Sequence, residues 1–190
     1  MFIETEATPN PATLKFLPGR IVMESGTLDI RDRHAAEHSP LARRLFAVPQ
    51  VTGVFYGSDF ISVTKSEGEW HHLKPALLGA IMEHFLSGET LFEGDVAQLQ
   101  AVSMSDEQEF YDPADTQTVA TIKELLETRV RPAVAGDGGD ITFRGFRDGI
   151  VYLTMKGSCA GCPSSTATLK HGIQNLLRHF LPDVREVEAY

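Results

Sequence analysis

Two cysteines are the residues of this chain with the clearest chemical potential. Cys159 and Cys162 are the only cysteines among 190 residues, and they stand three positions apart, as C-x-x-C, in the segment Gly157–Ser165. Cysteine thiolates are ligands that soft metal ions prefer. The segment Ile150–Met155 before them is rich in β-branched and aromatic residues, which is typical of a strand. Apolar residues at helical spacing follow them: Leu169, Ile173, Leu176, Leu177 and Phe180. The pattern predicts that the cysteines lie on a turn from a strand to a helix.

The start of the predicted helix would act on both sulfur atoms. Pro163 suits the first helical position, and Ser164 and Ser165 suit the capping region. The backbone N–H groups of a first helical turn have no partners within the helix and carry partial positive charge. We therefore expect the thiolate forms of Cys159 and Cys162 to be favoured, on a turn that solvent reaches.

Two thiolates do not complete a metal site. Structural zinc takes four ligands, and so does an iron–sulfur cluster held by cysteine alone. His171 and His179 are separated by about 12 Å along the predicted helix, which is too far for them to share one ion. Four sulfurs are reached when the cysteine pairs of two chains come together. Ligand count alone does not separate a shared zinc ion from a shared iron–sulfur cluster.

Paired cysteines have two other common uses. A thiol–disulfide redox protein of the thioredoxin type carries its motif early in the domain, whereas only one helix and one strand are predicted after Cys162. A structural disulfide is unusual in a cytoplasmic chain. A metal site is therefore the favoured interpretation, with zinc-bridged dimer and redox protein as the alternatives.

Two short motifs carry a resemblance to a known family. Asp137–Ile141 reads D-G-G-D-I, and Gly157–Pro163 reads G-S-C-A-G-C-P about twenty positions later. Together they resemble the Nfu (NifU C-terminal-like) iron–sulfur scaffold domain, over residues 113–190. The N-terminal half, with Thr5–Pro11 near its start, is similar to the N-terminal domain that accompanies it in Nfu proteins.

The resemblance implies a function and a set of partners. It implies a scaffold or carrier that binds a [4Fe-4S] cluster through Cys159 and Cys162, with one cluster per homodimer. It also implies transfer to apo iron–sulfur proteins and exchange with upstream cluster assembly proteins, without catalysis. The sequence shows neither a nucleophile with a base partner nor a phosphate-binding loop, so it does not suggest an enzyme.

Composition narrows the remaining classes. The formal charge of −9 disfavours nucleic acid as a partner. The sequence contains no run of eighteen apolar residues that would predict a membrane span. The opening Met1–Glu6 resembles neither a secretory signal nor a transit peptide. We therefore predict a cytoplasmic, bacterial protein; a mitochondrial matrix location would require that a transit peptide had been removed.

The chain length and the patterning predict an α+β fold with two small domains, each a small sheet with helices packed on it. We predict the first domain over residues 1–87, an acidic linker over 88–112, and the cluster-binding domain over 113–190. A short helical or extended piece is expected near 96–102. The first domain lacks catalytic spacing and is interpreted as a docking module. His71 and His72 beside Trp70 are not expected to form a metal site, because adjacent side chains point in different directions.

Local patterns place the elements of the first domain. They predict a hairpin of strands 2–7 and 13–17, a third extended piece at 21–23 and a surface loop over 29–39. A helix over 40–46 follows, and then a second hairpin of 51–56 with 60–64. The last element is a helix over 74–85, which Ser87-Gly88 ends.

In the second domain the patterns predict a helix from Asp112–Pro113 that Pro132 kinks or stops. The rest of this domain is predicted as a glycine-rich turn at 135–140 and strands at 141–143, 150–155 and 184–189. The long helix after the cysteines lies between the last two strands. Asp137 and Asp140 are expected to make turn hydrogen bonds rather than to bind a metal.

Overall fold

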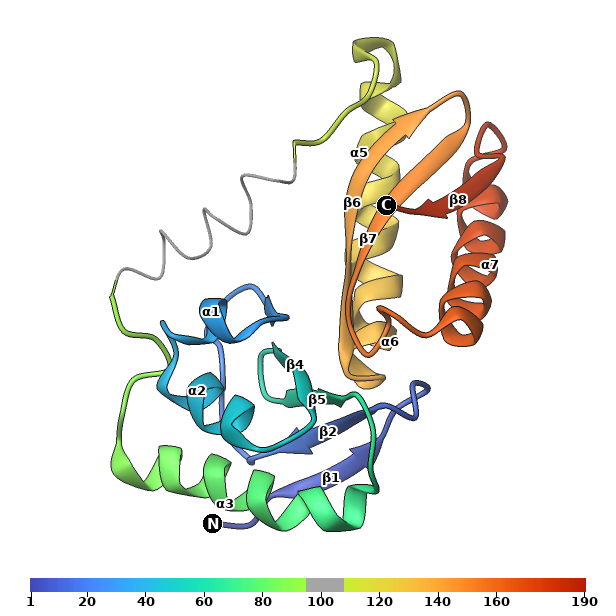
Figure 1. The fold of residues 1–190 in the computed structure, drawn as a ribbon. Helices are drawn as coiled ribbons and strands as arrows, with labels where there is room; N and C mark the ends of the chain where they lie inside the picture. The colour runs from blue at the N-terminus through green and yellow to red at the C-terminus, as the bar shows by residue number, and fades with distance from the viewer. Residues whose placement is uncertain (95–107) are drawn as a thin grey trace.

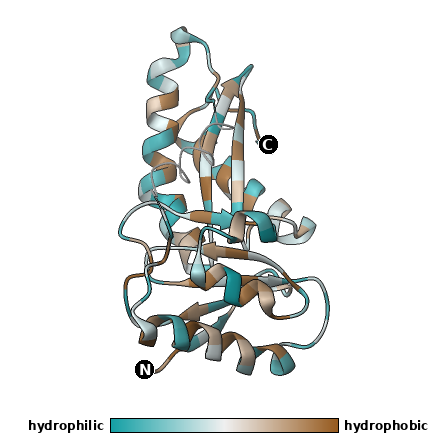
Figure 2. Cartoon of the chain, turned by 60° about the vertical axis from the view of Figure 1, so that its left-hand side comes forward, coloured by the Kyte–Doolittle hydropathy of each residue, from teal (hydrophilic) through white to brown (hydrophobic). Residues whose placement is uncertain are grey.

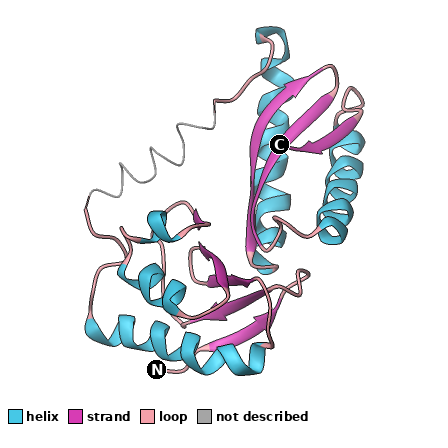
Figure 3. Ribbon diagram, in the orientation of Figure 1, coloured by secondary structure: helices cyan, strands magenta, loops and turns pink. Residues whose placement is uncertain are grey.

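The structure is a computed structural model, and it describes residues 1–94 and 108–190. It has the predicted α+β architecture with two domains, each built from one sheet and helices (Figures 1 and 3). The predicted piece near 96–102 lies outside the described residues. Within them, no helix combines the length and the apolar character needed to cross a membrane.

The first domain contains a five-stranded antiparallel sheet in the order β1-β2-β5-β4-β3. Its elements are β1 (Glu4–Ala7), β2 (Thr13–Leu17), β3 (Leu28–Ile30), α1 (Arg33–Ala36), α2 (Pro40–Ala47), β4 (Val51–Tyr56), β5 (Ile61–Lys65) and α3 (Trp70–Ser87). Both predicted hairpins are confirmed, β1 with β2 and β4 with β5. The helix at Pro40 is confirmed too, and the Ser39 hydroxyl caps it by accepting from the Ala42 N–H.

Two predictions for the first domain are wrong. Residues 21–23 form no strand, because the N–H groups of Val22 and Met23 both donate to the Ser58 carbonyl instead of to a neighbouring strand. The strand comes later as β3, which pairs with β4. The predicted loop over 29–39 also contains α1, whose first turn is capped by Asp32.

Helix α3 begins at Trp70, about one turn earlier than predicted, and runs through Pro75. It ends where predicted, since Gly88 adopts the left-handed conformation (φ 71°) that terminates helices. The next residues pack on the first domain: Arg43 makes a bidentate ion pair with Glu93, whose N–H donates to the His38 carbonyl.

The second domain contains a three-stranded sheet in the order β6-β7-β8. Its elements are η1 (Pro113–Asp115), α5 (Thr116–Leu125), η2 (Leu126–Val130), α6 (Arg131–Gly136), β6 (Gly139–Arg147), β7 (Ile150–Gly157), α7 (Pro163–Phe180) and β8 (Glu186–Ala189). Strands β6 and β7 form a hairpin, and α7 crosses over to bring β8 parallel to β7. Apolar and polar residues alternate along these strands (Figure 2), and the apolar face forms the core with the helices.

Pro132 does not end the helix. A π-helical turn, η2, ends at Val130, and α6 follows directly with Pro132 as its second residue and continues to Gly136. Proline lacks a backbone N–H and crowds the preceding turn, and a wider π turn accommodates both. The helical segment of α5, η2 and α6 therefore continues as far as the glycine turn beside the cysteines.

The domains meet at that turn. Figure 1 shows the end of β6 and β7 that carries the glycine and cysteine turns standing over the first domain's sheet. Hydrogen bonds cross this interface, including one from the Thr27 hydroxyl to the Asp140 carboxylate at 2.8 Å.

Candidate metal-ligand site

Both cysteines lie on the predicted turn between β7 and α7. Cys162 is the N-cap residue of α7, and Pro163 occupies the first helical position as expected. Both are free thiols. The turn is tied together locally, because the hydroxyl of Thr166 in the first turn of α7 donates to the Cys159 carbonyl at 3.0 Å.

Cys162 has the environment of a reactive thiol. It is half-buried, with its Sγ 3.4 Å from the Ser164 hydroxyl. Hydrogen bonding from Ser164 and Ser165 lowers the pKa of the Cys162 thiol to about 7. Its thiolate is therefore well populated at neutral pH, as expected from its place at the helix start.

Cys159 has the opposite environment, and the prediction that both thiolates are favoured on a solvent-reachable turn is wrong for it. Its exposed fraction is 6%, and it belongs to the hydrophobic core of the second domain. Burial raises the pKa of the Cys159 thiol to about 11, and the nearby charges of Asp137 and Asp140 act in the same direction. The sequence placed the residue on the turn, but it did not show that its sulfur points inward.

The glycine turn next to Cys159 is held by an ion pair between a buried carboxylate and a partly exposed guanidinium. Asp140 is 3% exposed and accepts two hydrogen bonds from the Arg131 guanidinium, at 2.9 and 2.8 Å. It also accepts from the Ile141 N–H, which confirms its predicted role as a hydrogen-bonding residue of the turn. The ion pair raises the pKa of Arg131. Sequence reasoning missed Arg131, although its spacing from Asp140 across the glycines was visible.

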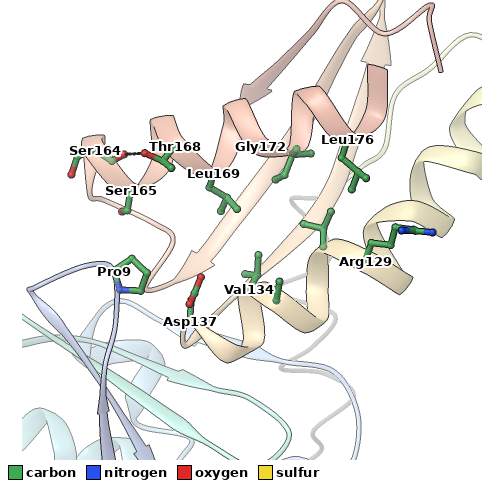
Figure 4. Close-up of a pocket in the computed structure, with 13 residues that line it drawn as sticks. Pro9, Arg129, Val134, Asp137, Ser164, Ser165, Thr168, Leu169, Gly172 and Leu176 are labelled. Atoms are coloured by element: carbon green, nitrogen blue, oxygen red, sulfur yellow. Dashed lines mark hydrogen bonds between the residues drawn. The ribbon is translucent and has the colours of Figure 1, made fainter. Parts of the chain in front are cut away.

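Sequence reasoning also missed a groove that Ser164 and Ser165 help to line, at the start of α7. It has a volume of about 570 Å³ and lies between α6 and α7 (Figure 4). Its lining is mainly apolar and includes Pro9 from the first domain's β1–β2 turn, Val134, Leu169, Ile173 and Leu176. The helical spacing of the last three residues was visible in the sequence. The sequence did not show that their side chains leave an open groove.

The histidines do not join the cysteines. His171 and His179 are exposed on α7. The rings of His71 and His72 lie 3.9 Å apart, so the expectation that they point in different directions is wrong. In residues 1–94 and 108–190, no three His, Cys, Asp or Glu side chains gather closely enough to hold a metal ion.

Fold and site together define a two-domain α+β protein that presents one cysteine pair at a strand-to-helix turn. Two family models match it: the scaffold protein Nfu/NifU N-terminal domain over residues 3–88 and the NifU-like domain over residues 122–188. The chain belongs to the Nfu family of NifU-like proteins, which confirms the resemblance found in its motifs.

Named relatives match over almost the whole chain. The human NFU1 iron-sulfur cluster scaffold homolog, mitochondrial, is 48% identical over 99% of this chain and 71% of its own length. NifU-like protein 5, mitochondrial, from Arabidopsis thaliana is 49% identical over 99% of this chain and 67% of its own length. A solution structure of a NifU-like protein from Saccharomyces cerevisiae is 27% identical, with a TM-score of 0.46 over 50% of this chain and 87% of its own.

These names correct one prediction. Both the human and the Arabidopsis relatives are named as mitochondrial proteins, which contradicts the predicted cytoplasmic, bacterial location.

Proposed function

We propose that this chain is an iron–sulfur cluster carrier that binds a [4Fe-4S] cluster as cargo and transfers it to apo-proteins. Cys159 and Cys162 of two chains would supply the four thiolates. The observation that carries the proposal is the placement of these two cysteines on one turn, with a low pKa at Cys162. The human relative's name, iron-sulfur cluster scaffold, supports the same role.

Ligand count supports sharing between two chains. Each chain has two cysteines, and the described residues offer no third metal ligand beside them. A cluster held by cysteine alone takes four thiolates. One cluster per homodimer follows, and cluster binding then favours the dimer by mass action.

The unlike environments of the two thiols suggest an order of events. Cys162 is accessible and acidic, so it would bind iron first. Cys159 has to leave the core and lose a proton before it can do so, since metal ligation uses the thiolate. In transfer, a thiolate of the target replaces one carrier thiolate at iron at a time, and the carrier cysteine leaves as a thiolate that can take up a proton. No bond of the protein is broken, so the role is that of a carrier and not of an enzyme.

The domain boundaries remain part of this proposal. We place a docking domain at 1–87, a linker at 88–112 and the cluster-binding domain at 113–190. The match of separate family models to 3–88 and 122–188 supports that division. Apo iron–sulfur proteins and upstream assembly proteins are the proposed partners.

The test is anaerobic reconstitution of the full chain, with Mössbauer spectroscopy, iron and sulfide analysis, and sedimentation velocity on matched apo and loaded samples. We expect a [4Fe-4S] spectrum, about two irons per chain and a dimer that reverts to monomer when a chelator removes iron. Cys162→Ser and Cys159→Ser should each abolish stable uptake while leaving the circular dichroism spectrum unchanged. Tightly bound zinc without sulfide would favour the zinc-bridged dimer, and a loaded monomer with four irons per chain would refute the shared cluster.

A further inference from the structure

Three side chains of the first domain hydrogen-bond to the turns around Cys159. The Ser62 hydroxyl donates to the Gly138 carbonyl at 2.6 Å. The Lys15 ammonium donates to the Gly136 carbonyl at 3.1 Å. The Asn10 amide lies 3.5 Å from the Ala160 carbonyl. The glycine turn and the cysteine turn are therefore both held from the other domain.

These contacts are buried. Ser62 is 1% exposed, Asn10 is 5% and Lys15 is 7%. Lys15 also pairs with Glu6 at 3.1 Å, so its charge has two partners at the interface. Buried polar groups that lose a partner carry a desolvation penalty. The interface therefore favours the arrangement in which all of these groups stay bonded.

Glycines let the two domains approach this closely. A Cβ at Gly138 would lie 2.8 Å from the Ser62 hydroxyl, and a Cβ at Gly157 would lie 3.0 Å from the Phe55 ring. Both glycines have positive φ, 82° and 66°. The glycines that flank the cysteine site thus serve the contact between domains as well as the turns.

A shared acceptor links this contact to Cys159. The Gly138 carbonyl accepts from Ser62 and also from the N–H of Ser158, the residue before Cys159. The Ser158 hydroxyl donates to the neighbouring Asp137 carbonyl at 2.5 Å. The turn that Ser62 holds is therefore the same turn that fixes the backbone entering Cys159.

We propose that the first domain is a positioning element for Cys159, with Ser62 and Lys15 as its positioning residues. In the apo-protein their hydrogen bonds hold the glycine turn against Ser158 and keep the Cys159 sulfur in the core. Separation of the two domains at this interface releases the turn and lets Cys159 reach a metal. The consequence for cluster uptake rests on the proposed function, whereas the claim that the first domain keeps Cys159 in the core does not.

The test compares full-length apo-protein with Ser62→Ala. Each sample is treated with iodoacetamide under native conditions, and mass spectrometry gives separate alkylation rates for Cys159 and Cys162. Loss of one buried hydrogen bond changes an opening equilibrium by about three- to tenfold. We expect the Cys159 rate to rise by that factor while the Cys162 rate stays unchanged. Lys15→Met should act in the same direction, which provides a second variant if Ser62→Ala folds poorly.

Two controls separate positioning from general loss of stability. Ser66→Ala makes the same chemical change at an exposed serine beyond β5 and should leave both rates unchanged. Tyr56→Phe removes the buried hydrogen bond to Ser39 (2.9 Å), whose tyrosine belongs to the hydrophobic core of the first domain. It should lower the stability of that domain without raising the Cys159 rate.

The outcomes are distinct. Unchanged Cys159 rates in both interface variants, or an equal rise in Tyr56→Phe, would overturn the positioning role. Anaerobic reconstitution adds a second readout: Ser62→Ala should load faster than the parent to the same final iron content. If no variant takes up a cluster but the alkylation pattern holds, the proposed cargo fails and the positioning role stands.

Discussion

Gly139→Ala tests how tightly the cysteine site is packed. Gly139 begins β6 and pairs with Gly157 on β7. A Cβ at this position would lie 2.6 Å from the Lys156 carbonyl oxygen and 2.7 Å from the Cys159 sulfur. The carbonyl belongs to the strand ladder and cannot turn away, so the strand and the sulfur both have to shift. A single methyl group would thus disturb the site from its glycine side.

The expected loss in free energy of unfolding follows from the space available for the methyl group. Forcing a methyl group into a packed region costs about 1–3 kcal/mol. Gly136→Ala is the matched control, because a Cβ there meets nothing within 4 Å and no positive φ opposes it. That substitution should be neutral or should stabilise by about 0.4–1 kcal/mol through the unfolded chain. The two variants should therefore differ by about 1–4 kcal/mol in free energy of unfolding, from the smaller cost with a neutral control to the larger cost with a stabilising one.

Urea unfolding provides the assay. Trp70 is the only tryptophan and lies in the first domain, so its fluorescence reports that domain while far-ultraviolet circular dichroism reports both. Gly139→Ala should move the second-domain transition to lower urea and leave the Trp70 transition close to that of the parent. A Gly139→Ala protein as stable as Gly136→Ala would refute the close packing of β6 against Lys156 and Cys159.

Two predictions concern pH. The alkylation rate of Cys162 should rise through a midpoint near pH 7, because hydrogen bonds from Ser164 and Ser165 favour its thiolate, and Ser164→Ala should move that midpoint upward; a parent midpoint near 9 would contradict this account. Burial lowers the pKa of His84 below its ordinary value of about 6.5, so the unfolded state binds the proton more readily and the first domain should lose stability as pH falls below that value. Trp70 fluorescence in urea at pH 7.5 and 5.5 measures the loss, which should shrink in His84→Gln; an equal loss in that variant would assign the pH dependence to other groups.

Local features of the fold were predictable because their causes lie within a few residues. The hairpin of β4 and β5 follows from two β-rich runs around a short glycine turn. Helix α2 follows from Ser39 as cap and Pro40 at the first position. The same reasoning placed the cysteines on the turn that leads into α7. The third strand was predicted at 21–23, but it forms at β3. Pairing with β4, which is distant in the sequence, selects this strand, and local preference does not.

The sequence by itself determined that the chain has two thiols, that they share one turn, and that a four-thiolate site needs a second chain. Only the tertiary structure decided how the two thiols differ. Cys159 enters the core because β6, β7 and α7 close around it, and burial then raises its pKa, whereas Cys162 at the helix start has a lowered one. Ser62 reaches Gly138 across 76 residues of chain, and no local pattern encodes that contact. Burial and contact between distant segments depend on how the elements pack, so spacing selected the candidate ligands, whereas packing sets the reactivity of the two thiols.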